Sequence, residues 1–214
     1  EEDISQFALD NNFQADFQTG QVAHTLLLGL DHQRSDSNAR WRWGSAGVPP
    51  SNIHNPIYGQ DFSNVQYFDM YDYDQKTQQT GLYAQDQMAL DNWRLTLGGR
   101  EDWVHTGTTF HNQGDATNTQ RDKKFSGNAA LSYVFDNGLT PYISYAESFQ
   151  AATGSTVNST DAFKPTEGKQ YELGIKYQPP GSKSLFTAAV FDLTQQNMSV
   201  TEGGVTRQVG EVRV

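Results

Sequence analysis

The sequence of 214 residues carries a formal net charge of −10 at pH 7 and contains no cysteine. Its acidic balance argues against a nucleic-acid partner, and the lack of cysteine excludes a disulfide framework or a thiolate site. Hydrophobic residues make up 36% of the chain, and nowhere do about 18 apolar residues follow one another, so no transmembrane helix is expected.

The first part of the chain predicts two strands joined by a turn at Thr19-Gly20. In segment 7–17 apolar residues occupy the odd positions except Asn11, and polar residues the even ones except Ala8. This alternation is typical of a strand with one apolar face. A second strand is expected over 22–34. The stretch from Ser35 to about Gln75 has no sustained period, so we expect a functional loop there.

Further strands are predicted at 81–90, 93–105, 125–135, 139–149, 170–177, 184–195 and from about Val205 onward. Short reversals at 91–92, 136–138 and 179–183 should share one rim, opposite long loops at 35–75, 107–122, 150–167 and 197–204. Short turns at one end and long loops at the other are typical of membrane barrels. The expected fold class is therefore all-β, an antiparallel up-and-down transmembrane β-barrel segment of about nine strands.

The pleat of a strand sends alternate side chains to opposite faces. This parity predicts that Leu95, Leu131, Tyr133, Leu173, Ile175 and Phe191 face lipid, and that Arg94, Asn128, Glu172 and Asp192 face the lumen. Aromatic residues near strand ends suit the two membrane interfaces, although aromatic residues are common in strands generally. The polar inner faces favour the membrane barrel, because a closed soluble barrel of this size would have an apolar interior.

Five segments of the sequence resemble motifs of a known protein family. They are GLYAQDQ (81–87), LGGREDW (97–103), TPYISYAESF (140–149), GKQYELGIKY (168–177) and AVFDLTQQN (189–197). Together they resemble the TonB-dependent outer-membrane siderophore receptors, and most closely the hydroxamate branch with the ferrichrome and ferrioxamine receptors. The earlier HTLLLGLD (24–31) is similar to that branch as well.

The resemblance implies a twenty-two-stranded barrel with an N-terminal plug domain inside it. Residues 1–214 would supply a middle part of this barrel, with the plug domain, the TonB-contacting segment and the remaining strands outside the chain. The start at Glu1-Glu2-Asp3, without Met, likewise suggests a fragment of a larger protein. The expected location is the bacterial outer membrane, in contact with its lipid, as a monomeric barrel.

The function implied by the resemblance is binding of a ferric hydroxamate siderophore outside the cell and its TonB-dependent import. No enzyme motif is present, and the five histidines are scattered. The iron would arrive already chelated, so no cofactor and no protein ligands to iron are expected. The alternative is a passive porin or adhesin-like barrel, and a plug-domain sequence before Glu1 would separate the two.

The candidate ligand-binding residues are aromatic and lie in the expected loop 35–75: Trp43, Trp41, Tyr67, Tyr71 and Tyr73. Rings offer a broad contact area to a compact chelate, and a Tyr hydroxyl adds a hydrogen bond. The resemblance places Trp43 where the ferrichrome receptor has a ligand-contacting aromatic residue. Anchoring of the loop or packing at the interface is the alternative role of Trp43.

The charged residues are expected to form salt bridges or to act by long-range attraction. Arg100, Asp102, Glu172 and Lys176 should face the lumen as salt-bridge partners of a plug or of neighbouring strands. The acidic residues Asp69, Asp72 and Asp74 suggest a solvated loop, and they would also attract a cationic chelate.

Overall fold

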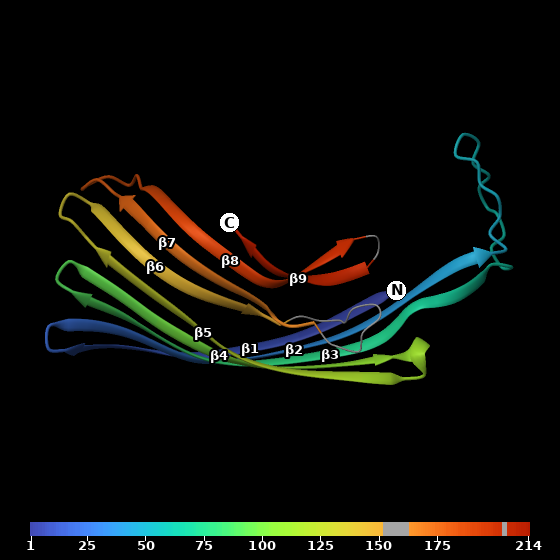
Figure 1. Ribbon diagram of the computed structural model, residues 1–214, viewed down its shortest axis with the longest axis horizontal. Coiled ribbons are helices and arrows are strands. Elements are labelled where there is room, and N and C mark those ends of the chain that lie inside the picture. Colours follow the sequence, from blue (N-terminus) through green and yellow to red (C-terminus); the bar gives the residue numbers. More distant parts are fainter. Residues whose placement is uncertain (152–162, 203–204) are drawn as a thin grey trace. The chain divides into compact units, whose positions relative to one another are not determined.

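The computed structural model describes residues 1–151, 163–202 and 205–214. In these residues nine strands form one sheet, in which the order along the sheet follows the order along the chain (Figure 1). The elements are β1 (Glu2–Thr19), β2 (Val22–Ala46), β3 (Gln66–Leu90), β4 (Trp93–Phe110), η1 (His111–Gln113), β5 (Ala116–Tyr133), β6 (Leu139–Gln150), β7 (Thr166–Tyr177), β8 (Phe186–Glu202) and β9 (Val205–Arg213). The prediction of nine strands in an up-and-down sheet is confirmed. Among the described residues, no helix has the length and apolarity to span a membrane.

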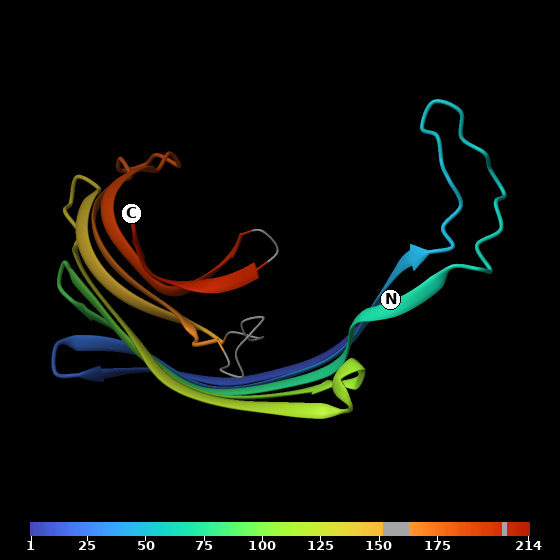
Figure 2. The ribbon, with the colours of Figure 1, turned by 45° about the vertical axis from the view of Figure 1, so that its right-hand side comes forward.

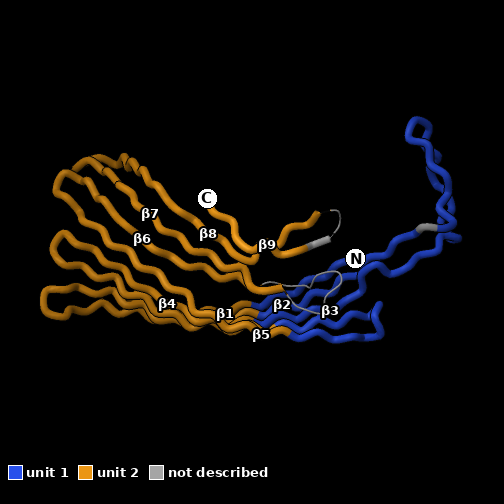
Figure 3. Tube along the Cα trace, in the orientation of Figure 1, with its two compact units in different colours: residues 1–7, 34–78, 106–119 blue, residues 8–33, 79–105, 120–214 orange. Residues whose placement is uncertain are grey.

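Contacts along the chain divide it into two compact units (Figure 3). Unit 1 comprises residues 1–7, 34–78 and 106–119, and unit 2 comprises residues 8–33, 79–105 and 120–214. Unit 1 therefore holds the distal parts of β2 and β3 and the reversal between β4 and β5. Unit 2 holds the short turns and the regular antiparallel sheet, in which β6, β7 and β8 curve together (Figure 2).

The short turns lie where the sequence predicts them. Gly20, Asp91, Gly138 and Gly181 all adopt positive φ, between 48° and 85°. Glycine reaches this region at no steric cost, and aspartate tolerates it better than most residues. At Gly138 a side chain is also excluded by space, because a Cβ there would lie 1.8 Å from the carbonyl oxygen of Gln178.

The long loops are much shorter than the sequence predicts. Residues 35–46 continue β2, residues 66–75 begin β3, and the expected loop 107–122 is a tight reversal between β4 and β5. β8 likewise runs to Glu202 through the expected loop 197–204. The connection within 150–167 runs from Gln150 to Thr166, and its residues 152–162 lie outside the described residues.

Polar pairing across the strands explains these extensions. Gln75 donates to the Thr108 hydroxyl at 3.0 Å, and the hydroxyls of Thr77 and Thr106 lie 3.4 Å apart. A membrane strand needs about 9–11 residues to cross, whereas β2 and β3 have 25 each. Outside the hydrocarbon both faces meet water, so apolar alternation is lost although backbone pairing continues.

Strand register tests the predicted facing in unit 2. Leu131 lies opposite Ile143, which lies opposite Leu173, and Leu173 lies opposite Val190. Directly opposed residues point to the same side of a sheet. Leu131, Leu173 and, by parity, Ile175 thus share an apolar face, as predicted.

Asn128 and Glu172 share the other face with Ser144, because Asn128 lies opposite Ala146 and Glu172 opposite Ser144. The prediction of a common polar face for these two residues is confirmed. By the same parity Tyr133, two residues after Leu131 in β5, shares the apolar face, as predicted. The predicted facings of Leu95 and Arg94 stay predictions.

The facing predicted for Phe191 and Asp192 is wrong relative to Leu173. Phe191 lies opposite Glu172 and Asp192 opposite Tyr171, so Phe191 shares the polar face and Asp192 the apolar face. The run Ala188-Ala189-Val190-Phe191 is apolar at every position. Its period therefore cannot fix the parity of β8, and the pairing with β7 decides it.

Candidate functional site

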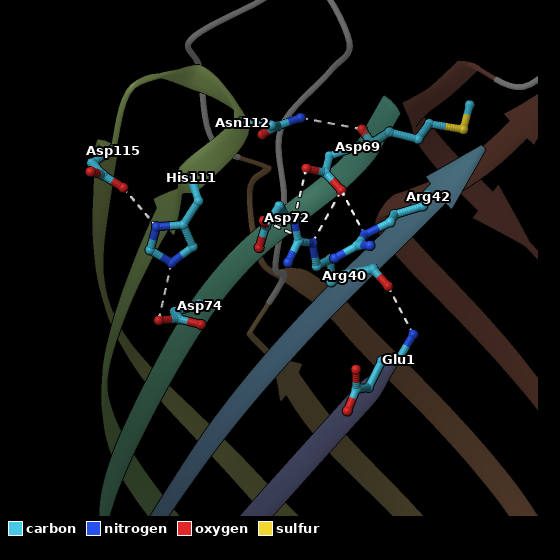
Figure 4. A network of polar contacts seen from close by, with 10 residues as sticks. Glu1, Arg40, Arg42, Asp69, Asp72, Asp74, His111, Asn112 and Asp115 are labelled. Atoms are coloured by element: carbon cyan, nitrogen blue, oxygen red, sulfur yellow. Dashed lines mark hydrogen bonds and ion pairs between the residues drawn. The ribbon is translucent and has the colours of Figure 1, made fainter. Parts of the chain in front are cut away.

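The candidate site lies in unit 1, where β2 and β3 are joined by residues 47–65. Two arginines of β2 meet two aspartates of β3 there (Figure 4). Arg40 donates both Nε and Nη2 to the Asp69 carboxylate, at 3.1 and 3.0 Å. Arg42 lies 3.2 Å from Asp69, and Arg40 also lies 3.4 Å from Asp72. The four side chains tie the distal parts of the two strands together.

The neighbouring arginines make the Asp69 carboxylate harder to protonate. The hydrogen bond from Arg40 lowers the pKa of the Asp69 carboxyl, so this group stays ionised to a lower pH than an ordinary aspartate. Glu1, directly before β1, also contacts the network, because the Arg40 backbone N–H donates to the Glu1 carbonyl oxygen at 2.8 Å. A bidentate pair of this kind fixes geometry more than it adds stability at an exposed site.

The predicted aromatic residues lie beside this network. Trp41 packs on Tyr71 with ring centroids 6.2 Å apart, whereas Tyr73 packs on Phe110 at 6.2 Å. Trp41 and Tyr71 keep 60% and 50% of their surface exposed, which leaves ring area available for a ligand. Tyr73 is half-buried and serves first as a contact between β3 and β4.

Trp43 and Tyr67 lie near the end of the paired region. A Cβ on Gly44, the neighbour of Trp43, would approach the Val65 side chain to 2.6 Å and the Tyr67 ring to 3.2 Å. The strands can therefore approach this closely because residue 44 is glycine. Trp43 is 55% exposed, and within the described residues its indole makes no hydrogen bond or ring contact. The five predicted residues thus share one unit, but they do not form a single ring cluster.

A second polar cluster joins β3 to the reversal after β4. His111 lies between two carboxylates, with Nδ1 2.6 Å from Asp115 and Nε2 3.2 Å from Asp74. The hydrogen bond with Asp115, followed by that with Asp74, raises the pKa of His111. The Asn112 amide donates to the Met70 carbonyl oxygen at 3.3 Å. Figure 4 shows these contacts next to the arginine–aspartate network.

Sequence reasoning missed both polar clusters. It treated Asp69, Asp72 and Asp74 as residues of a solvated loop, although each of them faces a cation or a histidine of a neighbouring segment. The spacing of the charged residues in the sequence could have indicated this pairing. Arginines at 40 and 42 and aspartates at 69 and 72 suit two extended segments that pair with each other.

The lumen charges predicted in unit 2 do form local pairs. Arg100 bridges Asp31 and Asp102, and Gln79 donates to Asp102 at 2.8 Å. Glu172 accepts a hydrogen bond from the Tyr142 hydroxyl, and the Lys176 ammonium lies 5.2 Å from the centre of the Tyr142 ring. These contacts satisfy the charges within neighbouring strands, which fits the structural role that the sequence predicts.

In the described parts of the chain, no group of three or more His, Cys, Asp or Glu side chains is arranged to hold a metal ion. What unit 1 offers instead is exposed aromatic surface, hydroxyl groups and fixed polar side chains. This combination suits a ligand with a mixed apolar and polar surface.

Comparison with known proteins gives a consistent result. A family model described as "TonB dependent receptor-like, beta-barrel" matches residues 1–214. The chain is 37% identical over 214 residues to the ferrioxamine B receptor of Salmonella typhimurium, covering 99% of this chain and 30% of that receptor. It is also 37% identical over 221 residues to the ferrichrome outer membrane transporter/phage receptor of Escherichia coli K12, covering 100% and 29%.

The chain thus spans 30% or slightly less of the length of these two relatives. Among solved structures, the closed form of the ferric-catecholate import receptor Fiu from E. coli K12 matches with a TM-score of 0.74. Its sequence identity is 22%, and the match covers 99% of this chain and 34% of that receptor. At this identity the likeness concerns the fold.

Proposed function

This chain belongs to the TonB-dependent receptor-like β-barrel family, and from that premise we propose that the whole protein imports a ferric hydroxamate siderophore. Members of the family are outer-membrane barrels of Gram-negative bacteria, and this chain is a barrel portion of such a receptor rather than an enzyme. Its apolar sheet face meets lipid and its polar face the lumen.

The observation that carries the proposal is the identity of 37% over essentially the whole chain to two relatives, one named for ferrioxamine B and one for ferrichrome. Both names denote receptors for iron chelates of the hydroxamate class. The iron is cargo that arrives chelated, so the protein has to recognise the organic shell rather than ligate the metal. The exposed rings of Trp41, Trp43, Tyr67 and Tyr71 suit that task, with Tyr73 in a supporting position.

The rest of the protein would complete the transporter. We propose that further strands close the barrel, that a plug domain fills it, and that TonB contacts the N-terminal part and delivers the energy for import. The completed barrel acts as a monomer in the outer membrane. A passive porin or an adhesin would need neither the plug nor TonB.

Iron uptake tests this proposal directly. The full-length gene is expressed in a Gram-negative strain that lacks its own hydroxamate receptors, and uptake of radioactive iron is followed with ferrioxamine B, ferrichrome and a ferric catecholate. We expect uptake of at least one hydroxamate chelate and its loss when tonB is deleted. Uptake that persists without TonB would instead identify a passive pore.

A further inference from the structure

The position of His111 between two carboxylates has a consequence for the protonation state of its ring. A neutral imidazole has one N–H and one bare nitrogen, and only the doubly protonated form donates from both nitrogens. An ionised carboxylate accepts hydrogen bonds and donates none. The contacts of Nδ1 with Asp115 and of Nε2 with Asp74 can therefore both be hydrogen bonds only while His111 is an imidazolium.

The two contacts differ in what they join. Asp115 lies four residues after His111, so that contact closes the reversal on itself. Asp74 belongs to β3, so the second contact fastens the reversal to another strand. On deprotonation the one remaining N–H stays with the shorter contact, 2.6 Å to Asp115 against 3.2 Å to Asp74. The bare Nε2 then faces the Asp74 carboxylate, and this one contact with β3 is lost.

We propose that His111 is a pH-dependent clamp that adds an ion pair between the β4–β5 reversal and β3 when protonated and gives it up when neutral. The clamp works near neutral pH because the two carboxylates hold the pKa of the ring above its ordinary value of about 6.5. Its stabilising contribution is present in full below the unfolded pKa and disappears as the pH rises through the folded pKa. His111 is the first residue of η1, directly after β4, and lies outside the part of the strand needed to cross a membrane.

Other groups around the clamp keep their contacts through this transition. Asp72 and Asp69 of β3 are engaged by Arg40 and Arg42 of β2. The Asn112 amide still donates to the Met70 carbonyl, and the Tyr73 ring still packs on Phe110. Deprotonation should thus loosen the reversal without unfolding β2, β3 or β4.

Amide hydrogen exchange in the full-length receptor, in detergent micelles between pH 5.5 and 8.5, tests the clamp. After correction for the intrinsic rate, exchange in residues 107–119 should become about two- to fivefold faster above the transition, the range expected for loss of one exposed ion pair. His111→Gln and Asp74→Asn should both abolish this step. His54→Gln is the matched control, because the His54 ring makes no hydrogen bond, ion pair or ring contact within the described residues, and it should retain the step.

A further variant separates the clamp from a general disturbance of the reversal. Asp115→Asn removes the carboxylate that takes the single N–H of the neutral ring, so the neutral His111 can donate from Nε2 to Asp74 instead. The exchange step should therefore shrink or disappear, with residues 107–119 staying protected across the pH range. The proposal is overturned by exchange that does not depend on pH in the wild type, by a step that survives in His111→Gln, or by a step of wild-type size in Asp115→Asn.

Discussion

At the scale of single residues, the exposed indole of Trp43 is where the proposed ligand contact can be tested most directly. The ring is 55% exposed at the end of β2, beyond the part of the strand that would cross the membrane. If it packs against a ferric hydroxamate, Trp43→Ala should cost on the order of 1–3 kcal/mol of binding free energy, or about 5- to 150-fold in affinity. Quenching of intrinsic fluorescence in the full-length receptor, titrated with several ferric siderophores, measures this loss.

Two comparisons make the Trp43 result specific. Tyr73→Leu should affect the ligand less, because Tyr73 is half-buried against Phe110. Membrane insertion should survive both substitutions. Unchanged affinity of Trp43→Ala for every siderophore bound by the wild type would leave Trp43 with an anchoring role.

Asp69 is the second residue for which a specific effect is expected, because its carboxylate forms ion pairs with both arginines of β2. Its pKa is lowered in the folded protein, so its contribution is present above the ordinary aspartate pKa of about 3.9 and is lost as the pH falls through the folded value. Asp69→Asn should imitate that loss at neutral pH and speed amide exchange in 38–44 and 66–72.

The matched control is Asp72→Asn, since among the described residues Asp72 pairs only with Arg40, at 3.4 Å, and Arg40 keeps Asp69. It should speed exchange less than Asp69→Asn does. Equal effects of the two substitutions would contradict the central place of Asp69. This acid transition runs opposite to that of His111, which loses its contact on the alkaline side.

At the scale of elements, the strands show where sequence reasoning succeeds and where it stops. Turns could be predicted because residues such as Asn137 and Gly138 favour turn conformations by themselves. The membrane-crossing parts of the strands could be predicted because lipid on one side and water on the other impose alternation. The distal parts of β2 and β3 could not be predicted, because both faces of the sheet meet water there and no alternation is imposed. Cross-strand pairs such as Arg40 with Asp69 hold these parts together.

The sequence pattern also could not determine which side chains of β8 face the apolar side of the sheet. Substitutions on the two faces test the facing that the strand register gives. Val190 lies opposite Leu173 and Phe191 opposite Glu172. In the full barrel, Val190→Arg near mid-membrane should cost about 2–4 kcal/mol of folding free energy. Phe191→Arg should cost clearly less, because it points to the polar face. Equilibrium unfolding of the full-length receptor in lipid vesicles gives both values, and a larger cost for Phe191→Arg would restore the parity predicted from sequence.

At the scale of the whole molecule, the sheet has two edge strands, β1 and β9. Each edge leaves a row of backbone N–H and C=O groups without strand partners, and in hydrocarbon every such group costs several kcal/mol. The sheet also presents exposed apolar side chains such as Leu173, Val190 and Phe186. A nine-stranded piece of barrel therefore depends on further strands to satisfy its edges.

This dependence predicts how residues 1–214 behave when they are produced alone. Refolding into detergent micelles or lipid vesicles should give aggregates or mixed oligomers, because the edges of β1 and β9 can pair only with other copies. The full-length receptor, treated in parallel, should give a monomeric barrel whose electrophoretic mobility in SDS changes on heating. Size-exclusion chromatography and amide exchange report the difference, with faster exchange expected in the edge strands of the short chain. Cooperative refolding of residues 1–214 into a monomer with protected edges would show that the sheet is complete by itself.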